Sequence, residues 1–412
     1  MRLLSGRAAV RAIARMAERR TKPSALEPRV RHIIQDVRRD GDRSLRRYAE
    51  RWDGLEADKS LRVADAELQW AARSLLPAVR RSLTQAASNI RRFCGWQKPA
   101  VWMRNRNGMC LGQVVRPLES VGCYVPGGRY PLVSTVLMTV IPAQVAGVKT
   151  IRVVSPKPSL EVLGAAAILG VREFYRVGGA QGIAALAYGT DSIPRVDKIV
   201  GPGNAYVTAA KKLVSFDCAI DFLAGPTETV VLSDSGTAAF IAADLVAQGE
   251  HDSDALGVFI TTSRPLAEAV AGEVKKLTMR NPVARQSLRA GAILLAASRD
   301  QAREWANLVA PEHITVDEED VPFIRNAGSI FVGDYSPQAA GDYASGPSHV
   351  LPTGGQSRFR GGLSVLDFVK IITIQQLSSP GLQRIAKTVE CLADTEGLAA
   401  HAHSIRVRST HA

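Results

Sequence analysis

The chain has 412 residues, of which 46% are hydrophobic, and a formal net charge of +13. A chain of this length can bury two or three hydrophobic cores, so it needs neither disulfides nor structural metals to fold. Its five cysteines are scattered and never spaced as Cys-x-x-Cys, which argues against a disulfide framework, a thiolate zinc site and a redox pair. We therefore expect a globular protein of the reducing cytoplasm.

Much of the positive charge lies before residue 110, in runs such as Arg38-Arg39 and Arg46-Arg47. Such runs can bind nucleic acid. Here they are interleaved with Asp and Glu, and apolar residues recur at helical spacing at Val30, Ile34 and Val37. This pattern is typical of helices with one solvated face and one packed face. We therefore predict that the first 110 residues are helical and that the protein has no nucleic-acid partner.

Residues 1–20 form a basic, amphipathic segment. Glu18 and the absence of Ser/Thr enrichment or of a cleavage signal argue against a transit peptide. We predict instead a helical N-terminal arm that packs on a partner.

The longest apolar stretch, residues 131–148, approaches the length of a membrane span. Pro142 and Gln144 interrupt it, and it is richer in Ala, Thr and Ser than a membrane span would be. The stretch therefore predicts a helix buried within the protein, and we expect no membrane segment.

From about residue 119, short β-branched runs, Gly or Pro turns and Ala/Leu-rich segments alternate, which predicts an α/β fold with mainly parallel sheets. A Gly-Pro pair at residues 224–226 marks a junction between two modules. The last 50 residues are predicted to be helices followed by a tail. The predicted strands are 120–125, 150–155, 173–177, 198–200, 229–233, 257–262, 292–295 and 329–332, and the predicted helices between them include 160–169, 181–188, 205–214 and 237–248.

Three glycine turns in the first module could place a phosphate at a helix N-terminus. They are residues 126–128, 178–181 and 201–204. None matches the dinucleotide fingerprint Gly-x-Gly-x-x-Gly, and any one of them could serve a purely steric purpose. Three in one module favour a ligand of the nucleotide type.

Gln248 and His251 lie three residues apart near the end of a predicted helix and project from nearly the same side of it. A carboxamide and an imidazole on an otherwise apolar face need a polar partner, and a divalent metal is one. Two ligands do not make a site, so the others must come from elsewhere, and Asp342 and His401 are candidates. The alternative is that each is an ordinary polar residue with its hydrogen bonds satisfied.

Glu312 and His313, after Pro311, put a carboxylate and an imidazole side by side in sequence. Such a pair can activate water and transfer protons near neutral pH. Adjacent acid and base residues also occur by chance.

Taken in order, these segments closely resemble the histidinol dehydrogenase family from about residue 20 to the C-terminus. The resemblance rests on VGCYVPGG (121–128), VGGAQ (177–181), DKIVGPGNA (197–205), AGPTE (224–228), QGEH (248–251), PEH (311–313), GDYASG (341–346) and SHVLPT (348–353). It implies a zinc-dependent, four-electron oxidation of L-histidinol, through an enzyme-held aldehyde, to L-histidine, with two NAD+ reduced in turn.

The family's fold implies an α/β protein of two Rossmann-like parallel-sheet modules, with a helical N-terminal arm and a helical C-terminal tail that crosses to the partner of a homodimer. Carried onto this chain, the expected parts are an arm at 1–20, a first α/β domain at 21–123 plus 227–363, an NAD-binding domain at 124–226, and the exchanged tail at 364–412.

The family's site residues also carry over onto matching positions. Its zinc ligands, for one Zn2+ per subunit, correspond to Gln248, His251, Asp342 and His401, and the substrate's imidazole and amino nitrogens complete the shell. His313 corresponds to the general base, and Glu312 to the residue that activates water. Thr227, His349 and Glu396 fall where the family contacts substrate, together with the zinc ligands and His313, and Tyr124, Gln181 and Asn204 fall where it contacts NAD.

Two positions depart from the family's usual pattern, since Thr227 stands where Ser is frequent and Gly249 where Ala is more usual. The closest alternative is a dehydrogenase of another alcohol, sulfonated or polyol, on the same zinc scaffold. A second alternative is a basic nucleic-acid-binding protein that keeps the fold without catalysis. The intact Glu312–His313 pair and the four ligand positions argue against lost activity.

Overall fold

The computed structural model describes residues 1–19, 25–127 and 132–409. Four sequence predictions reach beyond these ranges. Arg20 at the end of the predicted arm, Gly128 in the first glycine turn and Pro131 at the start of the apolar stretch lie outside the described residues, as do residues 410–412 of the tail.

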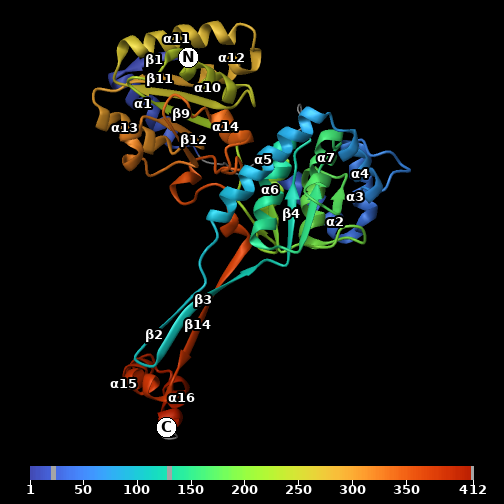
Figure 1. Cartoon of the computed structure of the whole chain (residues 1–412), viewed down its shortest axis with the longest axis vertical. Coiled ribbons are helices and arrows are strands. Elements are labelled where there is room, and N and C mark those ends of the chain that lie inside the picture. Colours follow the sequence, from blue (N-terminus) through green and yellow to red (C-terminus); the bar gives the residue numbers. More distant parts are fainter. Residues whose placement is uncertain (20–24, 128–131, 410–412) are drawn as a thin grey trace.

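Two parallel sheets form the two lobes of the molecule (Figure 1). The six-stranded sheet has the order β1-β11-β10-β9-β12-β13, and the five-stranded sheet has the order β6-β5-β4-β7-β8. All pairings within both sheets are parallel, which confirms the predicted α/β fold with two parallel-sheet modules. The strands of the first sheet are β1 (Arg2–Ser5), β9 (Glu228–Leu232), β10 (Leu256–Thr261), β11 (Ala292–Leu295), β12 (His313–Val316) and β13 (Ser329–Val332), and those of the second are β4 (Ser120–Tyr124), β5 (Thr150–Val154), β6 (Glu173–Tyr175), β7 (Lys198–Val200) and β8 (Ala219–Ile220).

Helices cover both faces of the six-stranded sheet. Successive residues of a strand point to opposite faces, so in β9 Val230 packs with one helical layer and Val231 with the other. The first layer contains α1 (Gly6–Ala17) and α13 (Arg299–Val309). The second contains α10 (Ala238–Gly249), α11 (Arg264–Thr278) and α12 (Pro282–Ala290), and the short α14 (Gln338–Tyr343) follows β13.

The five-stranded sheet is also covered on both faces. One core joins its strands to α4 (Asp65–Ser74), α5 (Pro77–Trp96), α6 (Val133–Ala146) and α7 (Leu160–Ile168). The other joins them to α2 (Glu27–Asp40), α3 (Asp42–Tyr48), α8 (Gly179–Tyr188) and α9 (Ala205–Val214). Helix α6 is the predicted apolar stretch, and it is buried as expected. Within the described residues, no helix combines the length and the apolarity that crossing a membrane requires.

The packing of α2 to α5 differs from the expected division of the chain, which put residues 21–123 in one domain with residues 227–363. Val30 and Ile33 of α2 pack in one core with Ile183 of α8, and α5 packs beside α6, so these helices cover the five-stranded sheet. Helical periodicity identifies a face that must be buried, but it does not identify the surface that buries it.

The N-terminal arm differs from its prediction too. Residues Arg2 to Ser5 form the edge strand β1, which pairs with β11 from Ala292 to Leu295. Helix α1 then buries Ala9 and Ile13 in the core that also contains α13. The arm therefore packs on its own chain, and its contact with a partner stays a prediction.

A three-stranded antiparallel ribbon projects away from both lobes (Figure 1). It consists of β2 (Trp102–Arg106), β3 (Met109–Pro117) and β14 (Val369–Leu377). These strands, like β1, correct the prediction that the first 110 residues are helical and the last 50 are helices with a tail. The predicted C-terminal helices are present as α15 (Ser379–Thr395) and α16 (Ala399–Ser409), which pack on each other at the far end of the ribbon.

Candidate active site

Glu312 and His313 lie at the amino end of β12, which is next to the edge strand β13 of the six-stranded sheet, and both are buried. The His313 ring stacks on Phe331 of the neighbouring strand β13 with centroids 5.9 Å apart. Its Nε2 lies 3.2 Å from Asp342 Oδ1. Its Nδ1 lies 3.8 Å from Glu312 Oε2 and has no hydrogen-bond partner among the described residues. One nitrogen of this buried imidazole is therefore held by a carboxylate, while the other has no hydrogen-bond partner among the described residues.

Asp342 connects this strand to the end of α10. Its second carboxylate oxygen, Oδ2, accepts a hydrogen bond of 2.8 Å from Gln248 Nε2. Asp342 comes from α14 and Gln248 from α10, so residues 94 positions apart meet in a buried contact. The structure thus brings together Gln248, Asp342 and His313, three of the predicted site residues.

His349 joins the same site to the other lobe. Its Nδ1 lies 2.7 Å from the carbonyl oxygen of Asp342, and its Nε2 lies 3.2 Å from Thr135 Oγ1 on α6. A carbonyl can only accept, so Nδ1 carries the proton and Nε2 accepts from the Thr135 hydroxyl. Burial, and to a lesser degree the charges of His313 and His251, lower the pKa of His349. This imidazole is therefore held neutral between the two lobes.

Burial sets the proton affinities of the carboxylates around the site. It raises the pKa of Glu312 to about 7, against the opposing effect of His313. It also raises the pKa of Asp244 on α10 to about 6, with a further contribution from Asp342. Burial alone would lower the pKa of His313, but Glu312 and Asp342 outweigh it and raise that pKa. An acid and a base with neighbouring proton affinities can exchange a proton near neutral pH.

The four predicted zinc ligands do not converge within one chain. Gln248 and Asp342 are in contact, and His251 follows the end of α10 as an exposed residue. His401 lies on α16, beyond the far end of the ribbon in Figure 1. Glu396, predicted to contact substrate, lies at the end of α15 in the same place. Across the described ranges, no three His, Cys, Asp or Glu side chains gather as a metal site would require.

The chemistry of the residues that do meet still fits a divalent cation. The charge of Asp342 raises the pKa of Asp244 and, separately, that of Glu312, so each of these carboxylates disfavours the charge of Asp342 in a buried region. A cation relieves that repulsion, and carboxylate, carboxamide and imidazole are all acceptable zinc ligands. Beside this group lies a cavity of about 480 Å³, lined by His313, Asp342 and His349 among others, with room for a small substrate.

Glu228 is a buried residue at this site that the sequence reasoning did not assign. Its backbone N–H donates to Glu312 Oε2 over 3.2 Å, and its own Oε1 accepts from Gly354 N and pairs with Arg19 at 3.3 Å. It follows Thr227, whose carbonyl accepts from Leu256 N; no described contact brings the Thr227 side chain to the cluster. Glu228 stood in the AGPTE motif, so the signal was present, whereas nothing in the sequence pointed to Thr135.

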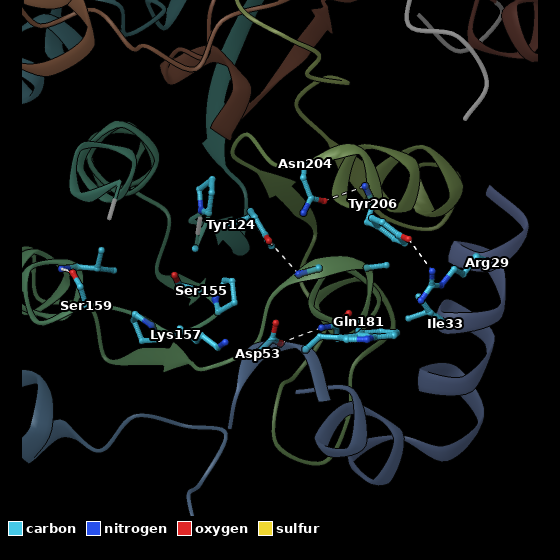
Figure 2. A pocket seen from close by; sticks show the side chains of 18 residues that line it. Arg29, Ile33, Asp53, Tyr124, Ser155, Lys157, Ser159, Gln181, Asn204 and Tyr206 are labelled. Carbon is cyan, nitrogen blue, oxygen red and sulfur yellow. Dashed lines mark hydrogen bonds between the residues drawn. The ribbon is translucent and has the colours of Figure 1, made fainter. Parts of the chain in front are cut away.

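The predicted NAD contacts lie around a second cavity, of about 660 Å³, at the carboxyl edge of the five-stranded sheet (Figure 2). Tyr124, Gln181 and Asn204 all line it. The Tyr124 hydroxyl accepts from Gly179 N over 3.1 Å, and Asn204 Oδ1 accepts from the first N–H groups of α9. The carboxyl edge is where open α/β sheets bind ligands.

The turn before Asn204 requires its glycine. Gly201 has φ +113°, and a Cβ there would lie 2.2 Å from the carbonyl oxygen of Tyr124. The close approach of these two backbone segments shapes one wall of the cavity. The glycine turns at 178–181 and 201–204 thus flank a cavity, as expected for a ligand of the nucleotide type.

Comparisons with known proteins cover nearly the whole chain. A family model described as "Histidinol dehydrogenase" matches residues 16–409. The histidinol dehydrogenase of Methanothermobacter thermautotrophicus is 47% identical over 395 residues, which is 92% of each chain. That of Geobacter sulfurreducens is 46% identical over 399 residues, 93% of each chain. The crystal structure of histidinol dehydrogenase from Elizabethkingia anophelis is similar with a TM-score of 0.95 at 33% identity, covering 100% of this chain and 98% of that one.

Proposed function

The chain belongs to the histidinol dehydrogenase family and is an NAD-dependent oxidoreductase of histidine biosynthesis, and from this premise we propose where and how the oxidation occurs. L-histidinol binds beside His313 and Asp342 and is oxidised twice, through L-histidinaldehyde to L-histidine. Each oxidation passes one hydride to one NAD+. The observation that carries this proposal is the buried His313–Asp342–Gln248 contact, with an uncommitted imidazole nitrogen, at the edge of a small cavity.

His313 acts as the general base of the first oxidation. With Nε2 protonated and donating to Asp342 Oδ1, its Nδ1 has a free lone pair that can accept the alcohol proton as the hydride leaves the carbon. Asp342 thus holds the imidazole in the required tautomer, and stacking on Phe331 fixes the plane of the ring.

Glu312 acts in the second oxidation. The aldehyde must first add water, and a carboxylate whose pKa is raised to about 7 can take a proton from that water near neutral pH. The backbone N–H of Glu228 holds Glu312 Oε2 in place. The resulting hydrate anion then loses a hydride to the second NAD+ and a proton to solvent, and becomes the carboxylate of histidine.

The residues that would hold one Zn2+ per subunit are Gln248, His251 and Asp342, with His401 of the partner subunit. When bound, the zinc supplies a template that orients the nitrogen atoms of the substrate. The position of α16 supports an exchange between subunits, because this helix, which carries His401, lies at the far end of the ribbon, away from α14, which carries Asp342 (Figure 1). The protein is accordingly a homodimer in which each tail completes the other subunit's site.

Substrate contacts come from the zinc ligands and His313, with Thr227, His349 and Glu396. His349 supports this role because it lines the same cavity as His313 and is held neutral. Tyr124, Gln181 and Asn204 bind NAD in the cavity at the carboxyl edge of the five-stranded sheet.

The test is to purify the protein with zinc and to count NADH formed per molecule of limiting L-histidinol. The proposal expects about two NADH per histidinol, since each carbon oxidation releases one hydride, with the activity lost on chelation and restored by Zn2+. Only about one NADH per histidinol would contradict the two-step reaction. No turnover of histidinol by zinc-loaded protein would instead favour another alcohol as substrate.

A further inference from the structure

Three helices begin at the cavity of the five-stranded sheet, and a polar side chain already lies at each start. Ser159 and Asn204 accept hydrogen bonds from backbone N–H groups of α7 and α9. At α8, Asp53 Oδ2 accepts from the N–H of Gly178, the residue before the helix, over 2.9 Å and from Gln181 Nε2 over 3.0 Å. A carboxylate therefore lies beside the N-terminus of α8, where a helix could otherwise receive a phosphate.

Two cationic side chains, Arg29 and Lys157, also line the cavity. The guanidinium of Arg29 is committed, because Nη1 donates to the Tyr206 hydroxyl over 3.1 Å and Cζ lies 5.8 Å and 5.6 Å from the ring centroids of Trp52 and Tyr206. Lys157 makes no hydrogen bond or ion pair with any residue that the structure describes. It is thus the cation of this cavity that no hydrogen bond or ion pair to a described residue holds, and its charge acts on Asp53, where it opposes the rise in pKa that burial causes.

The backbone places Lys157 there at a conformational cost. Its φ is +47°, in the left-handed region that residues with a Cβ seldom adopt, and such conformations cluster at functional sites. Gly54 makes room for it, since a Cβ at position 54 would lie 2.5 Å from Lys157 Cε. Figure 2 shows the Lys157 side chain extending towards Asp53. The left-handed backbone of Lys157 and the lack of a side chain at Gly54 together allow one ammonium group to reach the cavity.

We propose that Lys157 binds the diphosphate of the NAD cofactor, and that it is the residue by which this cavity recognises a dinucleotide. The inference rests on the proposed role of the cavity as the NAD site. The diphosphate brings two negative charges close to the Asp53 carboxylate, and only a cation on the cavity side can compensate them. An ammonium on a flexible stem can bind a phosphate oxygen as a point charge.

The test compares two competitive inhibitors of the zinc-loaded, full-length enzyme. ADP-ribose contains the diphosphate of NAD, and adenosine lacks it. In Lys157→Gln, the KM for NAD+ and the Ki for ADP-ribose should each rise about tenfold, since a charged hydrogen bond is lost. The Ki for adenosine and kcat should stay within about twofold of the parent's. Lys157→Arg should retain most of the affinity, and raising the salt concentration should weaken ADP-ribose binding more in the parent than in Lys157→Gln.

Three further variants decide between the possible failures. Lys149→Gln removes an exposed charge at the other end of β5 and should change neither Ki. If Asn204→Ala weakens NAD+ binding while Lys157→Gln changes nothing, the cavity binds the cofactor but Lys157 does not bind its diphosphate. If neither variant alters NAD+ binding, the cavity is not the cofactor site and both proposals fail. If Arg29→Gln, and not Lys157→Gln, separates ADP-ribose from adenosine, the diphosphate binds at Arg29 and the inference is overturned.

Discussion

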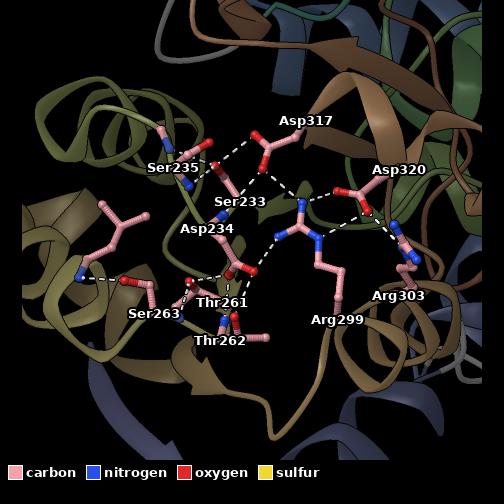
Figure 3. A network of polar contacts seen from close by, with 12 residues as sticks. Ser233, Asp234, Ser235, Thr261, Thr262, Ser263, Arg299, Arg303, Asp317 and Asp320 are labelled. Atoms are coloured by element: carbon pink, nitrogen blue, oxygen red, sulfur yellow. Dashed lines mark hydrogen bonds and ion pairs between the residues drawn. The ribbon is translucent and has the colours of Figure 1, made fainter.

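The carboxyl edges of the two parallel sheets differ, since one borders an open cavity and the other is closed by ion pairs. The strands β4 to β7 of the five-stranded sheet end at an open cavity of about 660 Å³ (Figure 2). The corresponding edge of the six-stranded sheet is filled by a network of ion pairs around Arg299 (Figure 3). Arg299 pairs with Asp234 after β9 at 3.0 Å, with Asp317 after β12 at 2.8 Å, and with the buried Asp320.

The network leaves few polar groups at that edge unpaired. Asp234 also accepts hydrogen bonds from the Thr262 backbone and hydroxyl and from Thr261, and Asp317 accepts from the Ser233 hydroxyl. The groups that could receive a phosphate or a ribose bond to one another instead. The buried acid–base group of this lobe lies at the opposite edge, where Glu228 begins β9 and His313 begins β12. One architecture therefore supports a ligand cavity at a carboxyl edge, or a closed carboxyl edge with a polar cluster at the amino edge.

The largest effect should come from His313, which tests whether the chemistry lies at the amino edge of the six-stranded sheet. His313→Ala removes the proposed base and should lower the rate of NADH formation by about 10²-fold to 10⁴-fold. Zinc content and dimer size should remain those of the parent. Rates near the parent's, measured with saturating histidinol and NAD+, would remove His313 from the role of base.

Arg299→Leu opens the closed carboxyl edge. It removes one of the two arginines that pair with the fully buried Asp320, and because Arg303 still pairs with it, the free energy of unfolding should fall by about 3 kcal/mol, the lower end of the cost of breaking a buried ion pair. Urea unfolding measures it. The matched control is Arg264→Leu on α11, whose exposed pair with Glu268 should contribute about 0–1 kcal/mol. Equal losses in the two variants would mean that the network does not stabilise the sheet.

His401→Asn tests whether the amino edge depends on a distant segment of the chain. Replacing a proposed ligand should weaken zinc binding roughly tenfold or more, measured as zinc retained after dialysis against a weak chelator. His403→Asn changes an exposed histidine two positions further along α16 and should keep its zinc. Equal zinc retention in both variants and the parent would show that the tail does not reach the site.

The smallest effect is a pH dependence that belongs to the closed edge. Burial would raise the pKa of Asp234, but hydrogen bonds from Thr262 and Thr261 and the charge of Arg299 hold it below its usual value. A depressed carboxyl pKa adds stability above the unfolded value of about 4, and this contribution is lost as the pH falls through the folded value. Between pH 5 and pH 3 the urea midpoint of Asp234→Asn should therefore fall less than the parent's. Asp300→Asn, at an exposed side chain, should follow the parent.

Local patterns predicted the elements that depend on neighbouring residues. All the strands and helices predicted between residues 119 and 332 are present, with ends shifted by one or two residues at most. The glycine turns identified the edge of the cavity because the residues that favour a turn are adjacent in the sequence. Strand β12 was not predicted because it has only four residues, and because its first residue, His313, was interpreted as a catalytic residue rather than as the start of a strand.

Contacts between distant segments could not be predicted in the same way. Thr135 and His349 are 214 residues apart, and Asp53 and Gly178 are 125 residues apart, so no pattern within a window of sequence relates them. The ribbon was not predicted from the sequence for a different reason. Its strands β2, β3 and β14 lie where charge and composition suggested helices, and the β-branched run of β14 carried a signal that was overlooked.

The pairing of β1 with β11 has a consequence for the order in which the chain folds during synthesis. Arg2 to Ser5 can join the six-stranded sheet only after Ala292 to Leu295 have left the ribosome. The five-stranded sheet uses strands between residues 120 and 220 and is complete long before that. Long-range parallel pairing of this kind is slow to form. The first residues to be translated are therefore among the last to reach their native position, and until then the edge of β11 remains open to pairing with other chains.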